Sequence, residues 1–444
     1  MDYLPQNRLK YSFMGKNSQD IIDIGFDLLK KYPHIFHGFH RAPFYNDEPK
    51  IFQYNTSFKE RKNKGTEDAI ASGTSFSQTS ALQKLFGELI ERFSLSDDRE
   101  RPLIKNKKYE KSKMLSPLLF LSFSDPQIKR LKLKKEEYLY ANYSWVESKN
   151  VFIGNNFLLP AQLIYVPYKW ERMEPMLQFG TSSGAACADT LETAIYRGIC
   201  ELIERDSFMV AYLNKIPCRR INLNCIRDLY INDIINKIER YQLEVYLINI
   251  TNDLSIFSVC AIIIDRTGLG PSISVGLKAG LDKRNVIVGA IEESLMTRSW
   301  TRDKVILGRN LKRYKSRSDI RTIEDRAYYW FSPQMIKNLN FWLNSDLINI
   351  KLNSRTTEAQ ESLYKIAKIL KDKGVNFYFA EITSSIFKDY PVHVVKVVSP
   401  ELQPIYLDER YKYFGKMRLF DSPEKMGYKP KTEEKLNNIP HPFL

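Results

Sequence analysis

The chain has 444 residues, of which 43% are hydrophobic and 27% are charged, and its formal net charge is +15 at pH 7. This is globular composition rather than that of a disordered chain, no apolar run reaches the roughly 20 residues that cross a bilayer, and the first residues lack the apolar stretch of a secretion signal. The five cysteines form no C-x-x-C pair, so neither a zinc knuckle nor a disulfide framework is indicated, and we expect a cytoplasmic protein.

Apolar spacing divides the chain into helices and strands in mixed order. Helical periodicity and runs of β-branched or aromatic residues predict the two kinds of element. In chain order, we expect helices at 19–31, 80–93, 190–212, 226–241, 285–299 and 356–373. We expect a loop at 55–75 and strands at 243–250, 257–265, 375–382 and 392–399. Helices and strands follow no strict βαβ rhythm, so we predict an α+β fold.

Two stretches of the chain share a beginning and an end. The first, GTSFSQTSALQKLFGELIERFS, covers residues 73–94, and the second, GTSSGAACADTLETAIYRGICELIERDS, covers residues 180–207. Each starts with Gly-Thr-Ser, continues with a helical pattern and reaches Glu-Leu-Ile-Glu-Arg. The first glycine precedes the first glutamate of this ending by 15 positions in one stretch (to Glu88) and by 21 in the other (to Glu201), so this is no simple duplication.

The helix of the second stretch has an apolar face and a charged face. Asp189 and Glu192 are spaced as an N-cap and its capping box. A core-facing stripe is predicted by three apolar residues at helical spacing: Ile195, Ile199 and Leu202. Another face carries three residues at the spacing i, i+3 and i+4: Glu201, Glu204 and Arg205.

The helix of the first stretch repeats this arrangement. Ser80 and Gln83 are spaced as a capping box. The apolar stripe consists of Leu82, Phe86 and Leu89. The charged face consists of Lys84, Glu88, Glu91 and Arg92.

Two such helices side by side would bring four carboxylates together. Like charges at short range repel, so the cluster needs cations. Mg2+ is a hard cation that takes oxygen ligands and accompanies phosphates, and the Gly-Thr-Ser segments offer hydroxyl and N–H groups to phosphate oxygens. The chain has neither a GxxxxGK[ST] loop nor a GxGxxG turn, so carboxylates and Mg2+ would have to hold the nucleotide. The alternative is two solvated helices with weak ion pairs.

Two weaker signals accompany these helices. A third helix, VGAIEESLMTRSW at 288–300, could add Glu293 and Arg298, although Glu292 competes for the same role. The spacing H-x-x-H-x-x-H at 34–40 could hold a metal, but it has no cysteine or acidic partner at standard spacing, so it indicates a loop.

These segments resemble the YcaO superfamily, whose members bind ATP through glutamate-rich helices rather than through a P-loop. The resemblance is carried by SSGAACADTLETAIYRGICELIERDSF, GELIERFS and GAIEESLMTRSW, and it covers residues 60–444. The segment ERYKYFGKMRLFDSPEKMGY and the ending IPHPF are similar to the azoline-forming branch, in particular to the cyclodehydratase subunits of streptolysin-type toxin pathways. The resemblance implies a YcaO-type α+β fold with mixed sheets and glutamate-bearing helices around an ATP/Mg2+ cleft.

The resemblance also implies a division of the chain and a reaction. The expected parts are an N-terminal extension at 1–60, a YcaO-like ATP-binding catalytic domain at 61–424 and a Pro-containing tail at 425–444 that enters the active site. In the implied reaction, a Cys, Ser or Thr side chain of a ribosomally made precursor peptide attacks the preceding amide carbonyl. ATP phosphorylates the amide oxygen, and loss of phosphate leaves a thiazoline or oxazoline.

Site residues follow from the resemblance position by position. The implied Mg2+ ligands are Glu88, Glu91, Glu201, Glu204 and Glu293. The implied nucleotide-binding set adds Lys84, Arg92, Asp189, Arg205 and Arg298. The implied catalytic set of the tail is Pro440, His441, Pro442 and Leu444. The two prolines favour an extended tail, and we expect its last four residues to contribute little to the core.

Several positions depart from the pattern of the relatives. Many relatives carry Ser where this chain has Lys84, and Asn and Glu where it has Asp189 and Thr193, so one ligand moves or one metal contact is lost. The arginine expected four residues before Glu293 is Gly289. The final residue is Leu444 where a proline is usual.

The expected partners are a precursor peptide and a separate leader-binding protein that resembles ubiquitin-activating enzymes. A flavin-dependent dehydrogenase and a homodimer remain open. Lys and Arg are spread along the chain without a nucleic-acid-binding signature, so we expect no nucleic acid and no membrane partner. The alternatives to cyclodehydration are thioamide or amidine formation and a non-catalytic peptide-binding scaffold.

Overall fold

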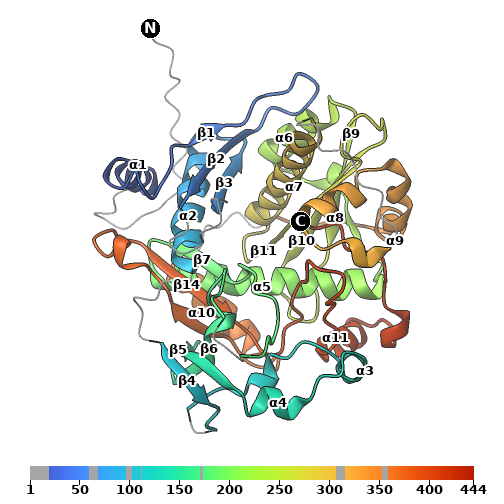
Figure 1. Ribbon diagram of the computed structural model, residues 1–444. Coiled ribbons are helices and arrows are strands. Elements are labelled where there is room, and N and C mark those ends of the chain that lie inside the picture. Colours follow the sequence, from blue (N-terminus) through green and yellow to red (C-terminus); the bar gives the residue numbers. More distant parts are fainter. Residues whose placement is uncertain are drawn as a thin grey trace.

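The computed structural model describes residues 20–59, 69–96, 103–111, 113–170, 174–306, 316–352 and 359–444. Within them, strands form three sheets with helices around and between them (Figure 1). Neighbouring strands are antiparallel except for one short parallel pair, β8 and β12. The expected α+β fold with mixed sheets is confirmed.

The three sheets differ in size and order. The first has the order β1-β2-β3, with His40–Arg41, Phe52–Phe58 and Ala69–Ser75. The second has the order β11-β10-β9-β8-β12, with Ile273–Ala279, Ser258–Asp265, Leu243–Asn249, Arg220–Ile221 and Leu347–Ile348. The third has the order β4-β5-β13-β14-β7, with Ile104–Lys108, Asn142–Asn150, Tyr378–Glu381, His393–Val398 and Ala185–Ala188, and β6 (Asn156–Pro160) pairs with β5.

Three long helices carry the residues of interest. They are α2 (Gln78–Leu95), α5 (Leu191–Asn214) and α7 (Lys283–Ile306). The other helices are α1 (Ile21–Lys31), α3 (Asp125–Arg130), α4 (Lys135–Leu139), α6 (Leu229–Glu239), α8 (Ile323–Tyr329), α9 (Asn340–Leu343), α10 (Ala359–Leu370) and α11 (Arg418–Lys425). Side-chain caps start several of them, such as the Asp20 carboxylate that accepts from the Ile22 N–H at α1.

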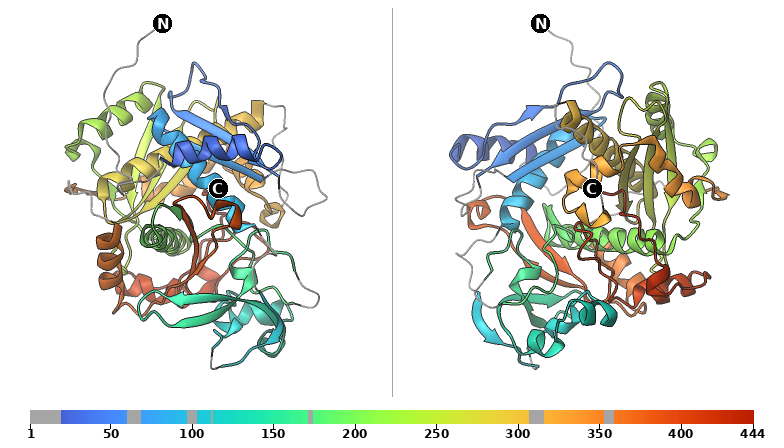
Figure 2. Two further views of the ribbon diagram at one scale, coloured as in Figure 1. Left: turned by 90° about the vertical axis from the view of Figure 1, so that its left-hand side faces the viewer. Right: turned by 45° about the vertical axis from the view of Figure 1, so that its right-hand side comes forward.

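Helix α5 runs through the middle of the molecule and contacts both the second and the third sheet (Figure 1). The left view of Figure 2 shows it nearly end-on, with strands on more than one side. Every residue from Asp206 to Asn214 is buried, as expected for a helix surrounded by protein on all faces. In the preceding turns of α5, several polar side chains are partly exposed to solvent. The helix therefore changes from partly exposed to fully buried at the Glu-Leu-Ile-Glu-Arg segment.

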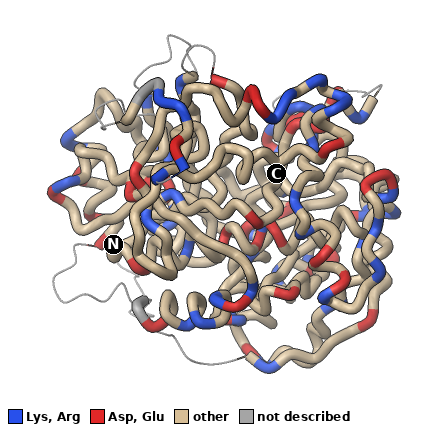
Figure 3. The backbone as a smooth tube through the Cα atoms, turned by 90° about the horizontal axis from the view of Figure 1, so that it is seen from below, with Lys and Arg blue, Asp and Glu red and all other residues tan. Residues whose placement is uncertain are grey.

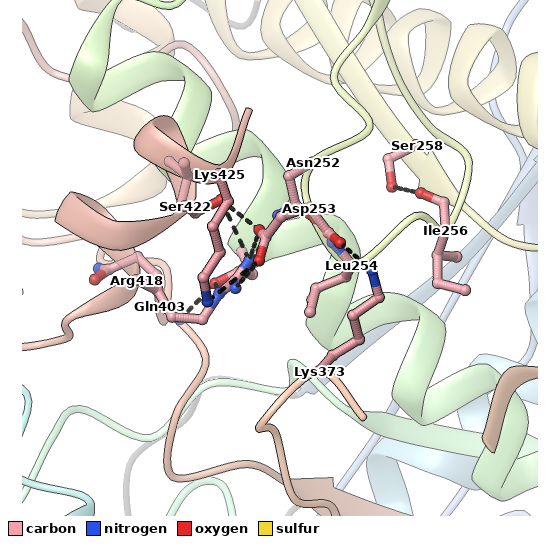
Figure 4. Close-up of polar contacts among 12 residues, drawn as sticks. Asn252, Asp253, Leu254, Ile256, Ser258, Lys373, Gln403, Arg418, Ser422 and Lys425 are labelled. Carbon is pink, nitrogen blue, oxygen red and sulfur yellow. Dashed lines mark hydrogen bonds and ion pairs between the residues drawn. The ribbon is translucent and has the colours of Figure 1, made fainter. Parts of the chain in front are cut away.

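The buried Asp206 of α5 is neutralised by a network that fixes the end of the chain. The Arg418 guanidinium of α11 donates to Asp206 at 2.6 Å and to Asp253 at 2.8 Å. Ser422 and Lys425 of α11 also point toward Asp253 (Figure 4). A buried carboxylate is tolerated only when paired, so this network ties α11, and the tail that follows it, to α5.

Most expected elements are present, and one expectation is wrong. The nine helices and strands expected after residue 79, from 80–93 to 392–399, all occur with small shifts at their ends. The expected loop at 55–75 is wrong, because β2 and β3 form a hairpin that pairs from Phe52↔Ser75 to Phe58↔Ala69. Strands from both sides of position 60 therefore share one sheet. Strand β2 alternates between buried and less buried residues, as a strand should. Small polar residues stand at some of its buried positions, so the sequence did not show this alternation as an apolar pattern.

Two surface features bear on the partners. In the part of the chain that the structure describes, no helix is both long and apolar enough to cross a membrane. Lys and Arg are interspersed with Asp and Glu over the face seen in Figure 3. The high net charge is therefore mixed with acidic residues on this face.

Candidate active site

Helices α2 and α7 each lie unusually close to a strand, and a glycine makes this possible. A β-carbon added at Gly73 of β3 would lie 2.0 Å from the Ala81 carbonyl oxygen of α2. A β-carbon added at Gly276 of β11 would lie 2.2 Å from the Ala290 carbonyl oxygen of α7. Only glycine allows backbones to approach so closely, so the glycine of the first Gly-Thr-Ser lets α2 pack on β3.

The close approach lets backbone N–H groups hold three glutamates. Ser72 N–H donates to Glu88 at 3.1 Å, Gly184 N–H to Glu201 at 3.3 Å and Leu277 N–H to Glu293 at 2.5 Å. The donor precedes its glutamate by 16, 17 and 16 residues. The same local geometry thus occurs three times, once on each of α2, α5 and α7.

Arginines join these glutamates to a second set of carboxylates. Arg205 of α5 lies 2.6 Å from Glu204, 3.4 Å from Glu201 and 4.0 Å from Glu293, so it links α5 to α7. Arg92 of α2 lies 3.2 Å from Glu88 and 3.9 Å from Glu91. The charges of Glu91 and Glu201 affect each other, which connects α2 to α5. All five expected carboxylates therefore lie in one cluster.

The tail approaches this cluster along α5, one turn at a time. Asn437 N–H donates to the Leu213 carbonyl at 2.7 Å, and Tyr212 Oη donates to the Pro440 carbonyl at 3.0 Å. The rings of His441 and Phe443 then pack on Phe208. Finally, the Phe443 ring lies 4.1 Å from the Arg205 guanidinium. Leu444 follows Phe443 directly in the sequence.

Comparison with known proteins identifies this arrangement. The family model described as YcaO cyclodehydratase, ATP- and Mg2+-binding, matches residues 72–403. The chain belongs to the YcaO family. The family named from the sequence is therefore confirmed, and the matched range contains all three glutamate-bearing helices. ATP and Mg2+, the cofactors expected from the resemblance, agree with the family description.

Solved YcaO structures share the fold at low sequence identity. A heterocyclase in complex with substrate and cofactor superposes with a TM-score of 0.76 at 20% identity, covering 94% of this chain and 57% of its own. The heterocyclase TruD gives 0.63 at 21% identity, covering 83% and 51%. YcaO from Methanopyrus kandleri, bound with AMPPCP and Mg2+, gives 0.62 at 14% identity, covering 88% and 94%. This chain spans about half the length of the two heterocyclase chains.

The relatives found by sequence comparison are described only as uncharacterized proteins. An uncharacterized protein of Methanothermobacter thermautotrophicus is 21% identical over 277 residues, which cover 61% of this chain and 68% of the relative. An uncharacterized protein in the tfuA 3′ region of Rhizobium leguminosarum bv. trifolii is 28% identical over 123 residues, which cover 27% and 29%.

The carboxylates of this YcaO cluster are crowded and partly desolvated, although within the described ranges no three of them already stand together as a metal-binding group. Burial, with the neighbouring glutamates as a further cause, raises the pKa of Glu91 to about 8 and that of Glu204 to about 7. Burial also raises the pKa of Glu293, although Arg205 works against it. Crowded carboxylates that resist ionisation are stabilised as anions by a hard cation. Side chains of Glu88, Glu91, Glu201 and Glu293 keep 19–28% exposure, so a ligand can reach them.

Two lysines of the site were not expected from the sequence. Lys396 of β14 is 3% exposed, and its Nζ donates to the Thr181 and Ser183 carbonyls at 2.6 Å each, which fixes the second Gly-Thr-Ser loop. Burial lowers the pKa of Lys396 to about 8. Lys278 of β11 lies near Glu204 and Glu293. The available signal for Lys396 was a lysine inside the apolar run VHVVKVVS.

The expected helix caps are wrong by one and three residues. Helix α2 begins after Ser77, whose hydroxyl accepts from the Ser80 N–H, and not at Ser80. Helix α5 begins after Thr190, whose hydroxyl accepts from the Thr193 N–H, and not at Asp189. Several Ser, Thr and Asp residues compete near each start, and each can cap a helix. Asp189 therefore lies before the N-cap of α5 and not on the helix that carries Glu201.

Two other expected residues lie outside the carboxylate cluster or at its rim. Lys84 donates to Glu292 at 2.5 Å and to the Thr74 carbonyl at 3.0 Å. It therefore pairs with Glu292, the alternative candidate to Glu293, and not with the cluster. Arg298 is 3% exposed, and its guanidinium binds Glu48 and Asp265 within 2.8 Å. The structure therefore places Arg298 in a separate buried ion-pair network.

Proposed function

We propose that this protein catalyses the ATP-dependent cyclodehydration of Cys, Ser or Thr residues in a ribosomally made precursor peptide, which gives thiazoline or oxazoline rings. The observation that carries the proposal is the meeting of the tail with the glutamate cluster, where Phe443 packs on Arg205. A nucleotide site alone would suit many reactions. The segment IPHPF packed beside it fits the azoline-forming branch, whose sequences it resembles.

The charged residues have distinct proposed tasks. Glu88, Glu91, Glu201, Glu204 and Glu293 would hold Mg2+, because carboxylate oxygens are its preferred protein ligands. Arg92 and Arg205 would face phosphate oxygens, because each already offers its guanidinium to the cluster. When bound, ATP supplies the phosphoryl group that turns the amide oxygen into a leaving group. The Lys396 ammonium keeps the loop at 181–183 in place through two carbonyls.

The tail residues divide into anchors and an acting end. His441 is fully buried, its Nε2 donates to the Tyr406 carbonyl at 2.6 Å, and Arg326 donates to the His441 carbonyl at 2.8 Å. Burial, with Arg326 as a further cause, holds the pKa of His441 well below its usual value, so the ring is neutral. Pro440 and Pro442 restrict the backbone on either side. A ring with so low a pKa is a weak proton acceptor, so we propose the carboxylate of Leu444 as the group that accepts the proton of the attacking side chain.

Isotope transfer tests the reaction. The precursor carries oxygen-18 in the amide that precedes the modified residue, and the protein is supplied with ATP, Mg2+ and its partner. The label should appear in released phosphate, measured by mass spectrometry, with loss of one water per ring. Label found only in water would refute activation of the amide by ATP. A product in which sulfur replaces oxygen would place the protein in the thioamide branch. If no ATP were consumed, the remaining hypothesis would be a non-catalytic peptide-binding scaffold.

The partners are part of the proposal. The neighbours include the Escherichia coli microcin synthetase McbBCD complex with pro-MccB17 bound, with a TM-score of 0.57 at 16% identity. By analogy, we propose a precursor peptide as substrate and a leader-binding protein that resembles ubiquitin-activating enzymes as partner. A flavin-dependent dehydrogenase would oxidise the rings further, and a homodimer remains open.

A further inference from the structure

Strand β11 is buried along its whole length except at one residue. Six of its seven residues are buried, and Lys278 alone is exposed. Gly276 and Lys278 lie on the same face of the strand, because side chains alternate between faces. That face packs against α7, where Gly276 meets Ala290 and Ser294. Lys278 therefore emerges between β11 and α7, beside Glu293.

The surface of α7 that Lys278 crosses carries no side chain. A β-carbon added at Gly289 would lie 3.2 Å from both Cγ and Cδ of Lys278, and 3.7 Å from its Cε. The methylene chain of the lysine therefore packs against the bare backbone of Gly289, one turn before Glu293. This is the position at which the resemblance led us to expect an arginine. A large side chain at 289 and the present path of Lys278 would compete for the same space.

The charge at the end of this side chain is held within the carboxylate cluster. The charged neighbours of the ammonium are the carboxylates of Glu204, Glu293 and Glu201. Among the described residues, the ammonium forms neither a hydrogen bond nor an ion pair. Arg205, which sits in the same cluster, pairs with Glu204 at 2.6 Å. A lysine whose only task was to neutralise a glutamate would form such a pair too.

We propose that Lys278 binds the phosphates of the nucleotide and supplies the positive charge that Gly289 does not. The inference rests on the proposed nucleotide site and adds to it a residue from β11, outside the three glutamate-bearing helices. An ammonium has three donors and no acceptor, so its free N–H groups are matched by phosphate oxygens. Lysine acts on phosphate as a point charge, and therefore the charge can come from a neighbouring strand without the fixed geometry that arginine requires.

The experiment exchanges the charge between the two positions. Lys278→Met keeps the methylene packing on Gly289 and removes the charge. Titration calorimetry with AMPPCP and Mg2+ should show affinity about ten- to a hundredfold weaker than wild type, the range of one hydrogen bond to a charged group. The double variant Lys278→Ala/Gly289→Arg should recover most of that loss, because alanine vacates the space beside residue 289 and arginine restores a positive charge there. Lys237→Met, which removes an exposed lysine of α6, should bind like wild type.

The outcomes separate this inference from the proposed function. If wild type does not bind AMPPCP, the nucleotide site itself is refuted. If wild type binds and Glu201→Gln abolishes binding, but Lys278→Met stays within twofold of wild type, only the role of Lys278 is overturned. Competition with adenosine gives a second readout. Lys278→Met should leave adenosine affinity unchanged, and an equal loss for adenosine and AMPPCP would show that the lysine does not act on phosphates.

Discussion

Single carboxylates in the cluster combine deep burial with access to a ligand. Glu204 has a side chain only 3% exposed and a pKa of about 7, so it is partly protonated at neutral pH. Glu201, one turn earlier, is 25% exposed and receives the Gly184 N–H. A cation that binds here must displace the proton from the carboxyls that are protonated. It also relieves the repulsion between the carboxylates that are ionised. The affinity of the site and the stability of the ligand-free fold therefore depend on the same residues in opposite ways.

Replacing one carboxylate by its amide should separate binding from folding. Glu201→Gln or Glu204→Gln should weaken binding of ATP with Mg2+ by about a hundredfold or more, since loss of a metal ligand exceeds the 10–100-fold effect of losing its supporting partner. Thermal unfolding should stay close to wild type, because glutamine resembles the protonated acid. Calorimetric titration and thermal scans measure both. Unchanged affinity in both variants would remove the metal from these helices.

The raised pKa of Glu91 predicts opposite pH trends for folding and binding. Its pKa is about 8 in the fold and 4.5 ordinarily, so its contribution to stability is present below pH 4.5 and is lost as the pH rises through 8. Glu91→Gln should therefore become more stable relative to wild type from pH 6 to pH 8, by at most about 1.4 kcal/mol per pH unit. Denaturant unfolding at each pH measures this. Mg2+ affinity of wild type should rise over the same range, and a pH-independent difference would contradict the assignment.

At the scale of elements, the site is built from strand–helix contacts that glycine permits. Gly73→Ala would place a methyl group 2.0 Å from the Ala81 carbonyl and should cost about 1–3 kcal/mol through overpacking. Because the neighbouring Ser72 N–H holds Glu88, nucleotide affinity should fall as well. Gly87→Ala in α2 is the matched control. It meets nothing within 4 Å and should gain about 0.5–1 kcal/mol of helix stability. Equal unfolding midpoints for both variants would contradict this packing.

Helix faces could be predicted from the sequence because they depend on spacing within one element. The glutamates at 88, 91, 201, 204 and 293 project where the period of the helix places them. Sequence spacing did not place Arg298, because its partners Glu48 and Asp265 come from distant segments. It also matched Gly73 with Gly180, whereas in the structure the equivalent N–H donors are Ser72 and Gly184. Lys278 was missed because the role proposed for it depends on the bare backbone of Gly289 in another element.

At the scale of the whole molecule, the tail connects the core to the site. We expected its last four residues to contribute little to the core, and that expectation is wrong. His441 is fully buried and Phe443 is 5% exposed, because α5 and Tyr406 enclose them. The Arg418 network at the other end of the segment holds α11 on α5 (Figure 4). The tail is thus fixed at both ends rather than laid loosely over the surface.

Changes to the tail should therefore fall into two classes. Deleting residues 441–444 should lower stability by about 3 kcal/mol or more, from lost apolar burial and the carbonyl that Arg326 binds, and should also abolish ring formation. Adding one glycine after Leu444 should leave the unfolding midpoint unchanged, yet it moves the carboxylate by up to ~3.6 Å and should also stop ring formation. Normal ring formation by the extended protein would show that the terminal carboxylate takes no part.

The three amides that hold glutamates, at Ser72, Gly184 and Leu277, each belong to a different strand–helix unit. Their proton and nitrogen resonances should respond strongly when the bound carboxylate changes its charge or accepts a cation. A nitrogen–proton correlation spectrum of deuterated protein would thus contain one built-in probe for each unit. A ligand that engages the whole site should move all three signals with a single midpoint. Mg2+ alone, if it reaches only part of the site, should move a subset, and the pattern of shifts would show the order in which the site fills.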